Sequence, residues 1–87
     1  SDSMASGARL ALQKAGIDPE GIVTVGIDYI SEAQEAIKQG LQTASFTYPT
    51  CAEESVEVVM DILNGKPVSR YVQVDSKLIT KNKRLAI

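Results

Sequence analysis

The chain has 87 residues, a formal net charge of −2 and a hydrophobic fraction of 44%, values typical of one small globular domain. No apolar run approaches the ~20 residues that a membrane-spanning helix needs. One cysteine and no histidine exclude an intrachain disulfide, a thiolate metal site, histidine-ligated metals and histidine-based catalytic triads.

The first predicted element is a helix over residues 3–15. Its sequence, SMASGARLALQKA, places apolar residues at the three- and four-residue spacing of one helical face. Asp2 or Ser3 can cap its start, and Gly16 can take the left-handed conformation that ends many helices. Residues 22–27 then form a strand that is apolar on both faces, which predicts a parallel sheet covered on both sides.

Two further helices alternate with a second strand. Ser31 opens a helix in which Gln34 completes a capping box and Gly40 marks the end. Residues 43–47 form the second predicted strand. Residues 50–65 form a third helix with an apolar stripe and a capping box of its own.

Residues 66–87 contain two short strand candidates, 71–74 and 78–80, and a basic tail. Residues 1–65 hold three basic and ten acidic groups, whereas residues 66–87 hold six basic groups and one acidic group. The tail KNKR at 81–84 can indicate a nucleic-acid contact. A single short cluster without interleaved aromatic residues is more typical of a solvated tail, so no nucleic-acid partner is expected for this segment.

The alternation of helix and strand predicts the α/β class: part of a three-layer αβα sandwich around a parallel sheet with right-handed crossovers. The chain opens on a helix whose preceding strand is missing, and three or four strands make a thin sheet. The 87 residues therefore resemble a single partial domain from the C-terminal end of a larger α/β protein.

Three polar residues are candidates for a binding site, because ligands of open α/β sheets lie at the carboxyl ends of parallel strands. Asp28 follows the first strand, Thr47 ends the second, and Ser1, with Asp2 beside it, lies where a preceding strand would join the first helix. Their short polar side chains suit a small neutral polyol. Each has an ordinary alternative as a turn former, a strand end or a helix cap. None has a partner that would make it a nucleophile or a general base, so no catalytic residue and no metal ligand is predicted.

Taken in order, five stretches resemble the C-terminal segment of type 1 periplasmic binding proteins, the ribose- and galactose-binding group. DSMASGARLALQKAG is similar to that family's N-D-x-M-A-x-G-A helix, and VTVGIDY to its V-V-G-x-D strand end. The other three, similar to the segments that follow, are EAIKQGLQTASFTYP, VVMDILNGKPV and VDSKLIT. Effector domains of lactose-repressor-like regulators share much of this pattern, and SFTYPT also resembles sensor domains of bacterial hybrid two-component kinases.

The resemblance implies a fragment of a two-lobed, periplasmic-binding-protein-like fold. Residues 1–47 would be part of the second lobe, and the helix at 50–65 would pack on the first lobe. Residues 66–87 would be a crossover strand with a basic tail.

The resemblance also implies roles for the three candidate residues. Asp28 matches the aspartate that hydrogen-bonds sugar hydroxyls in sugar-binding members. Ser1 stands where the family has a ligand-contacting asparagine, and Thr47 where it has a glutamine. Because both of these residues differ from the family pattern, the identity of the ligand does not transfer.

The implied function is non-enzymatic binding of a sugar or similar polar solute, for ABC transport or for signal sensing. The implied partners are that solute and an ABC permease or sensor kinase, with no cofactor and a periplasmic location. A fragment with uncovered sheet edges would also be prone to self-association. Two alternatives stay open. One is the cytoplasmic effector-binding domain of a lactose-repressor-like regulator, and the other is a phospho-receiver domain with Asp28 as acceptor, which lacks the expected upstream acidic pair.

Overall fold

The computed structural model describes residues 1–82 and 84–86, with side chains over residues 1–82. Within these residues the elements follow in the order α1 (Asp2–Lys14), η1 (Pro19–Gly21), β1 (Val25–Asp28), α2 (Ser31–Lys38), β2 (Ala44–Thr47), α3 (Ala52–Leu63), β3 (Lys77–Thr80) and β4 (Arg84–Ala86). The three predicted helices are confirmed, and the strands predicted at 22–27, 43–47 and 78–80 form β1, β2 and β3. None of the helices in this part of the chain is long and apolar enough to cross a membrane.

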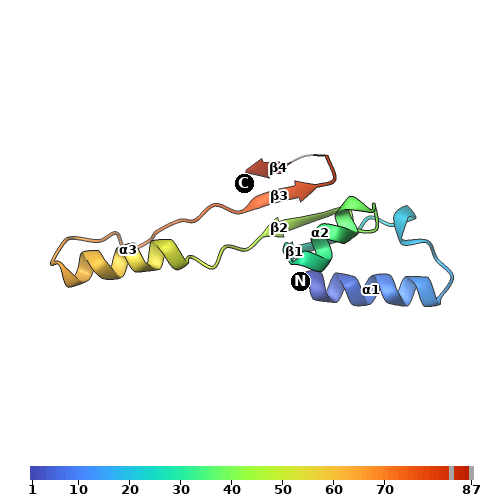
Figure 1. Cartoon of the computed structure of the whole chain (residues 1–87), viewed down its shortest axis with the longest axis horizontal. Coiled ribbons are helices and arrows are strands. Elements are labelled where there is room, and N and C mark those ends of the chain that lie inside the picture. The colour runs from blue at the N-terminus through green and yellow to red at the C-terminus, as the bar shows by residue number, and fades with distance from the viewer. Residues whose placement is uncertain (83, 87) are drawn as a thin grey trace.

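One predicted strand does not form: residues 71–74 run as irregular backbone. In Figure 1 they belong to the long connection between α3 and β3, outside the sheet. Val72 and Val74 line a hollow against α3 instead of pairing with a neighbouring strand. The β-branched side chains that suggested a strand therefore contribute to local packing. A strand also needs a neighbour with which to exchange backbone hydrogen bonds, and this segment has none among the described residues.

The helix starts differ from the predicted caps. The side chain of Ser1, and not that of Asp2 or Ser3, caps α1 by accepting a hydrogen bond from the backbone N–H of Met4 at 3.3 Å. α2 begins after Ile30 without a side-chain cap, and α3 begins after Cys51, whose φ is 63°. Both predicted capping boxes are therefore wrong.

The sheet has the order β1-β2-β3-β4 and is mixed. β1 and β2 are parallel, as a strand–helix–strand connection through α2 requires, and Asp28 is in register with Thr47. β3 pairs antiparallel with β2, and β4 pairs antiparallel with β3. The predicted parallel sheet thus holds for the first pair alone, because the chain returns from α3 in the opposite direction.

Helices cover one face of the sheet. Gly26 and Ser45 are paired and buried on the face that α1 and α2 cover. On the other face Val25 and Ile27 are 61% and 47% exposed. Within the described residues α3 stands away from the sheet (Figure 1), so the predicted covering of both faces stays a prediction. The buried apolar core comprises Ala5, Ala33, Ala36, Ile37, Ala44 and Ile79.

α3 stands away from the sheet at the end of two long connections (Figure 1). The molecule measures 61 × 22 × 18 Å, and its radius of gyration of 17.6 Å exceeds the ~12 Å of a compact chain of this length. The apolar stripe of α3 is at least 50% exposed at Val56, Val59, Met60, Ile62 and Leu63. Because no described element covers this stripe, the predicted packing of residues 50–65 on another lobe stays a prediction.

Candidate functional site

The three candidate residues lie at one edge of the fold. Asp28 and Thr47 end the parallel strands β1 and β2 side by side. Ser1 precedes α1, whose first residue, Asp2, bonds to the turn that follows β1. The sequence therefore placed these three residues correctly with respect to one another.

Two of these three side chains already have structural partners. The Ser1 hydroxyl accepts the capping bond of α1. The Thr47 hydroxyl accepts a hydrogen bond from the backbone N–H of Lys77 at 2.8 Å, and the Thr47 carbonyl accepts one from the Ser76 hydroxyl at 2.6 Å. The carboxylate of Asp28 is exposed, and no side-chain hydrogen bond to it is found in the described residues. Ser1 thus caps its own helix and Thr47 links β2 to the start of β3, so of the three only Asp28 presents an unused polar side chain.

The most extensive polar site is instead centred on Asp2, which is 1% exposed. Its Oδ1 accepts a hydrogen bond from Gln42 Nε2 at 2.9 Å, and the hydroxyl of Ser45 lies 2.9 Å from both carboxylate oxygens. Its Oδ2 accepts from the backbone N–H of Tyr29 at 2.6 Å and from that of Ile30 at 3.3 Å. One carboxylate therefore ties the start of α1 to β2 and to the turn after β1.

Arg9 extends this buried network with a second charge. Its Nη1 donates to Gln42 Oε1 at 2.7 Å, while Gln42 Nε2 also donates to the carbonyl of Ala44 at 3.0 Å. Arg9 and Gln42 are only 7% and 2% exposed. A buried charge is tolerated when it is paired and hydrogen-bonded, and here Gln42 links the guanidinium to the Asp2 carboxylate. Both charged groups are therefore hydrogen-bonded within the fold, and neither is free to take part in a reaction.

Gly26 makes room for this network. A Cβ atom added at Gly26 would meet Asp2 Oδ1, at 2.0 Å, and Gln42 Nε2 at 3.1 Å. A glycine inside a strand often marks the close approach of another group, and at this position that group is the Asp2 carboxylate. From the sequence Asp2 was predicted as a helix cap or, beside Ser1, as part of a ligand-binding position. Its network was missed, although a glycine in the middle of an apolar strand was a signal for it.

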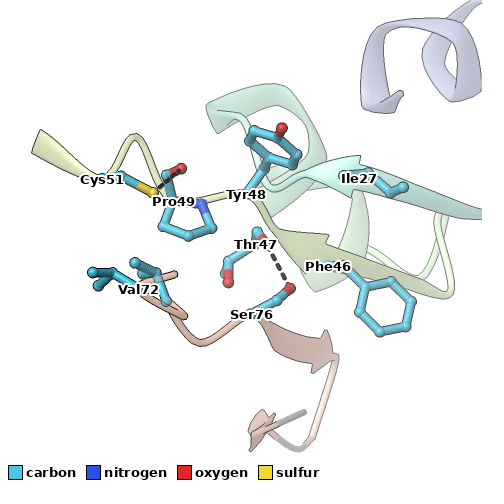
Figure 2. Close-up of a pocket in the computed structure, with 9 residues that line it drawn as sticks. Ile27, Phe46, Thr47, Tyr48, Pro49, Cys51, Val72 and Ser76 are labelled. Atoms are coloured by element: carbon cyan, nitrogen blue, oxygen red, sulfur yellow. Dashed lines mark hydrogen bonds between the residues drawn. The ribbon is translucent and has the colours of Figure 1, made fainter. Parts of the chain in front are cut away.

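A groove of about 470 Å³ opens beside Thr47, between the two connections that lead to and from α3 (Figure 2). Its lining is mainly apolar and includes Ile27, Phe46, Tyr48, Pro49, Val72 and Val74. The polar groups of Thr47 and Ser76 at its edge are already bonded to each other or to backbone. The groove therefore lacks the array of free hydrogen-bonding groups that a polyol needs. No group of three or more His, Cys, Asp or Glu side chains that could hold a metal occurs in the described part of the chain.

Comparison with known proteins finds one informative similarity. The chain is 34% identical over 82 residues to the HTH-type transcriptional repressor MelR of Bacillus subtilis (strain 168). The match covers 93% of this chain and 24% of that protein, so the chain spans about a quarter of the length of the curated relative. No protein-family model matches the chain. No solved structure matches it either.

This similarity contradicts the predicted membership of the type 1 periplasmic binding protein family, since the relative is described as a repressor. The predicted sugar binding for ABC transport or sensing is corrected on the same ground. The same similarity corrects the predicted partners, which were a sugar and an ABC permease or a sensor kinase. It also corrects the expectation that no nucleic acid is a partner. The effector-domain alternative gains no support from this match, because the name of the relative states only that it is a transcriptional repressor. The phospho-receiver alternative gains none either, since Asp28 belongs to no acidic cluster in the described residues.

Two residues of the motifs that carried the resemblance have structural roles. The aspartate of the D-x-M-A stretch is Asp2, and the glycine of the V-G-x-D stretch is Gly26. These two residues are in contact inside the fold, where one supplies a buried carboxylate and the other the space for it. A motif that is required for packing indicates how a chain folds, but it does not identify the ligand that the chain binds.

Proposed function

We propose that this chain is part of a transcriptional repressor that binds DNA in the full-length protein. The observation that carries the proposal is the 34% identity, over 93% of the chain, to an HTH-type transcriptional repressor. A helix-turn-helix contacts DNA by placing its second helix in the major groove. The proposed role includes no chemical step, so we propose a protein that is not an enzyme. We also propose a cytoplasmic location, where bacterial DNA is found.

The described residues suggest where DNA phosphates can be contacted. α1 and α2 are separated by η1 and β1, and α2 and α3 by β2, so no two described helices are joined by the short turn of a helix-turn-helix. Exposed basic side chains are concentrated after α3, at Lys66, Arg70, Lys77 and Lys81. Such side chains neutralise phosphates without reading sequence.

The proposal predicts specific and salt-sensitive DNA binding by the full-length protein that contains these residues. Fluorescence anisotropy can compare a DNA fragment from upstream of its own gene with a scrambled fragment of equal length. We expect the native fragment to bind at least ~10³-fold more tightly, with the logarithm of the affinity falling linearly as the logarithm of salt concentration rises. Equal affinity for both fragments, or no binding at ~50 mM salt, would contradict the proposal.

A four-residue variant and a two-residue control test the contribution of this segment to binding. Glutamine substitutions at Lys66, Arg70, Lys77 and Lys81 remove four exposed charges. If all four contact phosphate, the salt slope should fall by up to ~0.9 for each charge removed. Lys14→Gln with Lys38→Gln, at the ends of α1 and α2, is the control for a general change in net charge.

A further inference from the structure

The turn between β1 and α2 has an unusual backbone. Asp28 has a φ of 116° and Tyr29 a φ of 56°. Residues with a side chain rarely adopt positive φ values, and two in succession persist only where surrounding structure holds them. The turn is also accessible, since Asp28 is exposed and Tyr29 is partly exposed at the edge next to Thr47.

Asp2 provides most of the hydrogen bonds that hold this turn, and the Ser45 hydroxyl accepts a further one from the backbone N–H of Tyr29 at 3.2 Å. Asp2 Oδ2 accepts hydrogen bonds from the backbone N–H groups of Tyr29 and Ile30, at 2.6 and 3.3 Å. Hydrogen bonds to an ionised carboxylate are among the strongest in proteins. Because the same carboxylate is fixed by Ser45 and Gln42, it is positioned whether or not the turn is in place. The turn is thus bonded to a rigid acceptor.

The beginning of α2 depends on the conformation of this turn. Ile30 is the N-cap residue of α2 and supplies no side-chain hydrogen bond. Its carbonyl accepts from the backbone N–H of Gln34 at 3.0 Å, and the side chain of Gln34 donates to the carbonyl of Tyr29 at 3.2 Å. A change of backbone conformation at Tyr29 would therefore remove the partners that organise the first turn of α2.

We propose that Asp2 is a clasp that holds the Asp28–Tyr29 turn in its left-handed conformation, making the turn and the first turn of α2 a two-state element. In the clasped state α2 begins at Ser31. When the clasp opens, the turn relaxes to negative φ and the start of α2 frays. Displacement of the first residues of α1 opens the clasp. A shift of α1 therefore changes the backbone conformation at the exposed edge of the fold, at Asp28. The proposal rests on these contacts alone and is independent of the proposed function.

Hydrogen exchange measured by mass spectrometry on the full-length protein tests the clasp. Asp2→Asn keeps the size of the side chain but replaces one acceptor oxygen with a donor. We expect the exchange of the amides of residues 29–35 to rise in this variant by at least ~10-fold more than that of residues 8–14 in α1, which loss of the Asp2 network also affects. Ser3→Asn, an exposed change one position further along α1, is the control and should leave both sets unchanged.

A second variant tests whether strain in the turn drives its opening. Glycine adopts positive φ without steric cost, so adding Asp28→Gly to Asp2→Asn should restore the slower exchange of Gln34 and Glu35. Unchanged exchange at residues 29–35 in Asp2→Asn would overturn the proposal. An equal increase throughout residues 1–47 would overturn it too, because it would indicate general destabilisation. Local acceleration that Asp28→Gly does not reduce would disprove the two-state element.

Discussion

Replacing Gly26 with alanine is expected to destabilise the region formed by α1, β1 and β2 by about 3–4 kcal/mol. The added methyl group would lie 2.0 Å from Asp2 Oδ1, a distance that no Cβ contact allows. Either the carboxylate leaves its buried position or β1 moves away from α1. If the carboxylate leaves, Gln42, Ser45 and the N–H of Tyr29 lose a buried acceptor, and if β1 moves, the turn after β1 is drawn away from that acceptor. Either change leaves buried polar groups without a partner, so the expected loss exceeds that of an ordinary surface substitution.

Hydrogen exchange of the β1 and β2 amides in the full-length protein measures this effect. At ~1.4 kcal/mol for each factor of ten, the exchange rates should rise by about 10²–10³. Gly7→Ala is the matched control, because a Cβ at Gly7 has no neighbour within 4 Å. That change lies inside α1 and should stabilise the helix by about 1 kcal/mol. If both alanine variants exchanged at similar rates, the account of the Asp2 site would be incorrect.

Replacing Gln42 with leucine is expected to cost about 3–5 kcal/mol in the same region. Gln42 accepts from Arg9 and donates to Asp2, so its loss leaves two buried charged groups without the side chain that links them. Arg9 is only 7% exposed and cannot recover the missing bond from solvent without moving. Gln13→Leu, on the exposed surface of α1, should change stability by no more than about 0.5 kcal/mol.

A double-mutant cycle separates loss of the pairing from loss of packing. Arg9→Met combined with Gln42→Leu removes the buried cation together with its acceptor, and two apolar side chains of similar size can pack there. We expect the double variant to be more stable than the sum of the single effects predicts, by at least about 1 kcal/mol. Strict additivity of the two single variants would show that Arg9 and Gln42 do not interact.

The sequence predicted the elements of the fold better than the contacts between them. Apolar residues at helical spacing located α1 and α3, and Ser31, Gln34 and Gly40 located α2. Gly16 and Gly40 adopt the positive φ expected at helix ends. These signals are local, since each depends on residues a few positions apart. Residues 71–74 have strand-like composition, but whether they pair is decided by the distant position of β2, which composition does not encode.

The Asp2 site was missed for a related reason. Its hydrogen bonds join residues 27 to 43 positions apart, so no short sequence window contains both partners. An aspartate at the start of a helix is usually a cap, and that local explanation was sufficient for Asp2. The same limit affected the reading of the motifs: the V-G-x-D and D-x-M-A stretches were used to assign ligand contacts to Asp28 and Ser1. The contact between Gly26 and Asp2 of the same two stretches, inside the fold, was not foreseen.

Transcription measured with and without the full-length protein tests the proposed function most directly. Deleting the gene in its native host should raise the transcripts of a small set of genes, and restoring the full-length protein should return them to their original level. The DNA upstream of those genes should be recovered when the protein is cross-linked to the chromosome. If no transcript rises on deletion and no chromosomal DNA is recovered with the protein, it is not a transcriptional repressor.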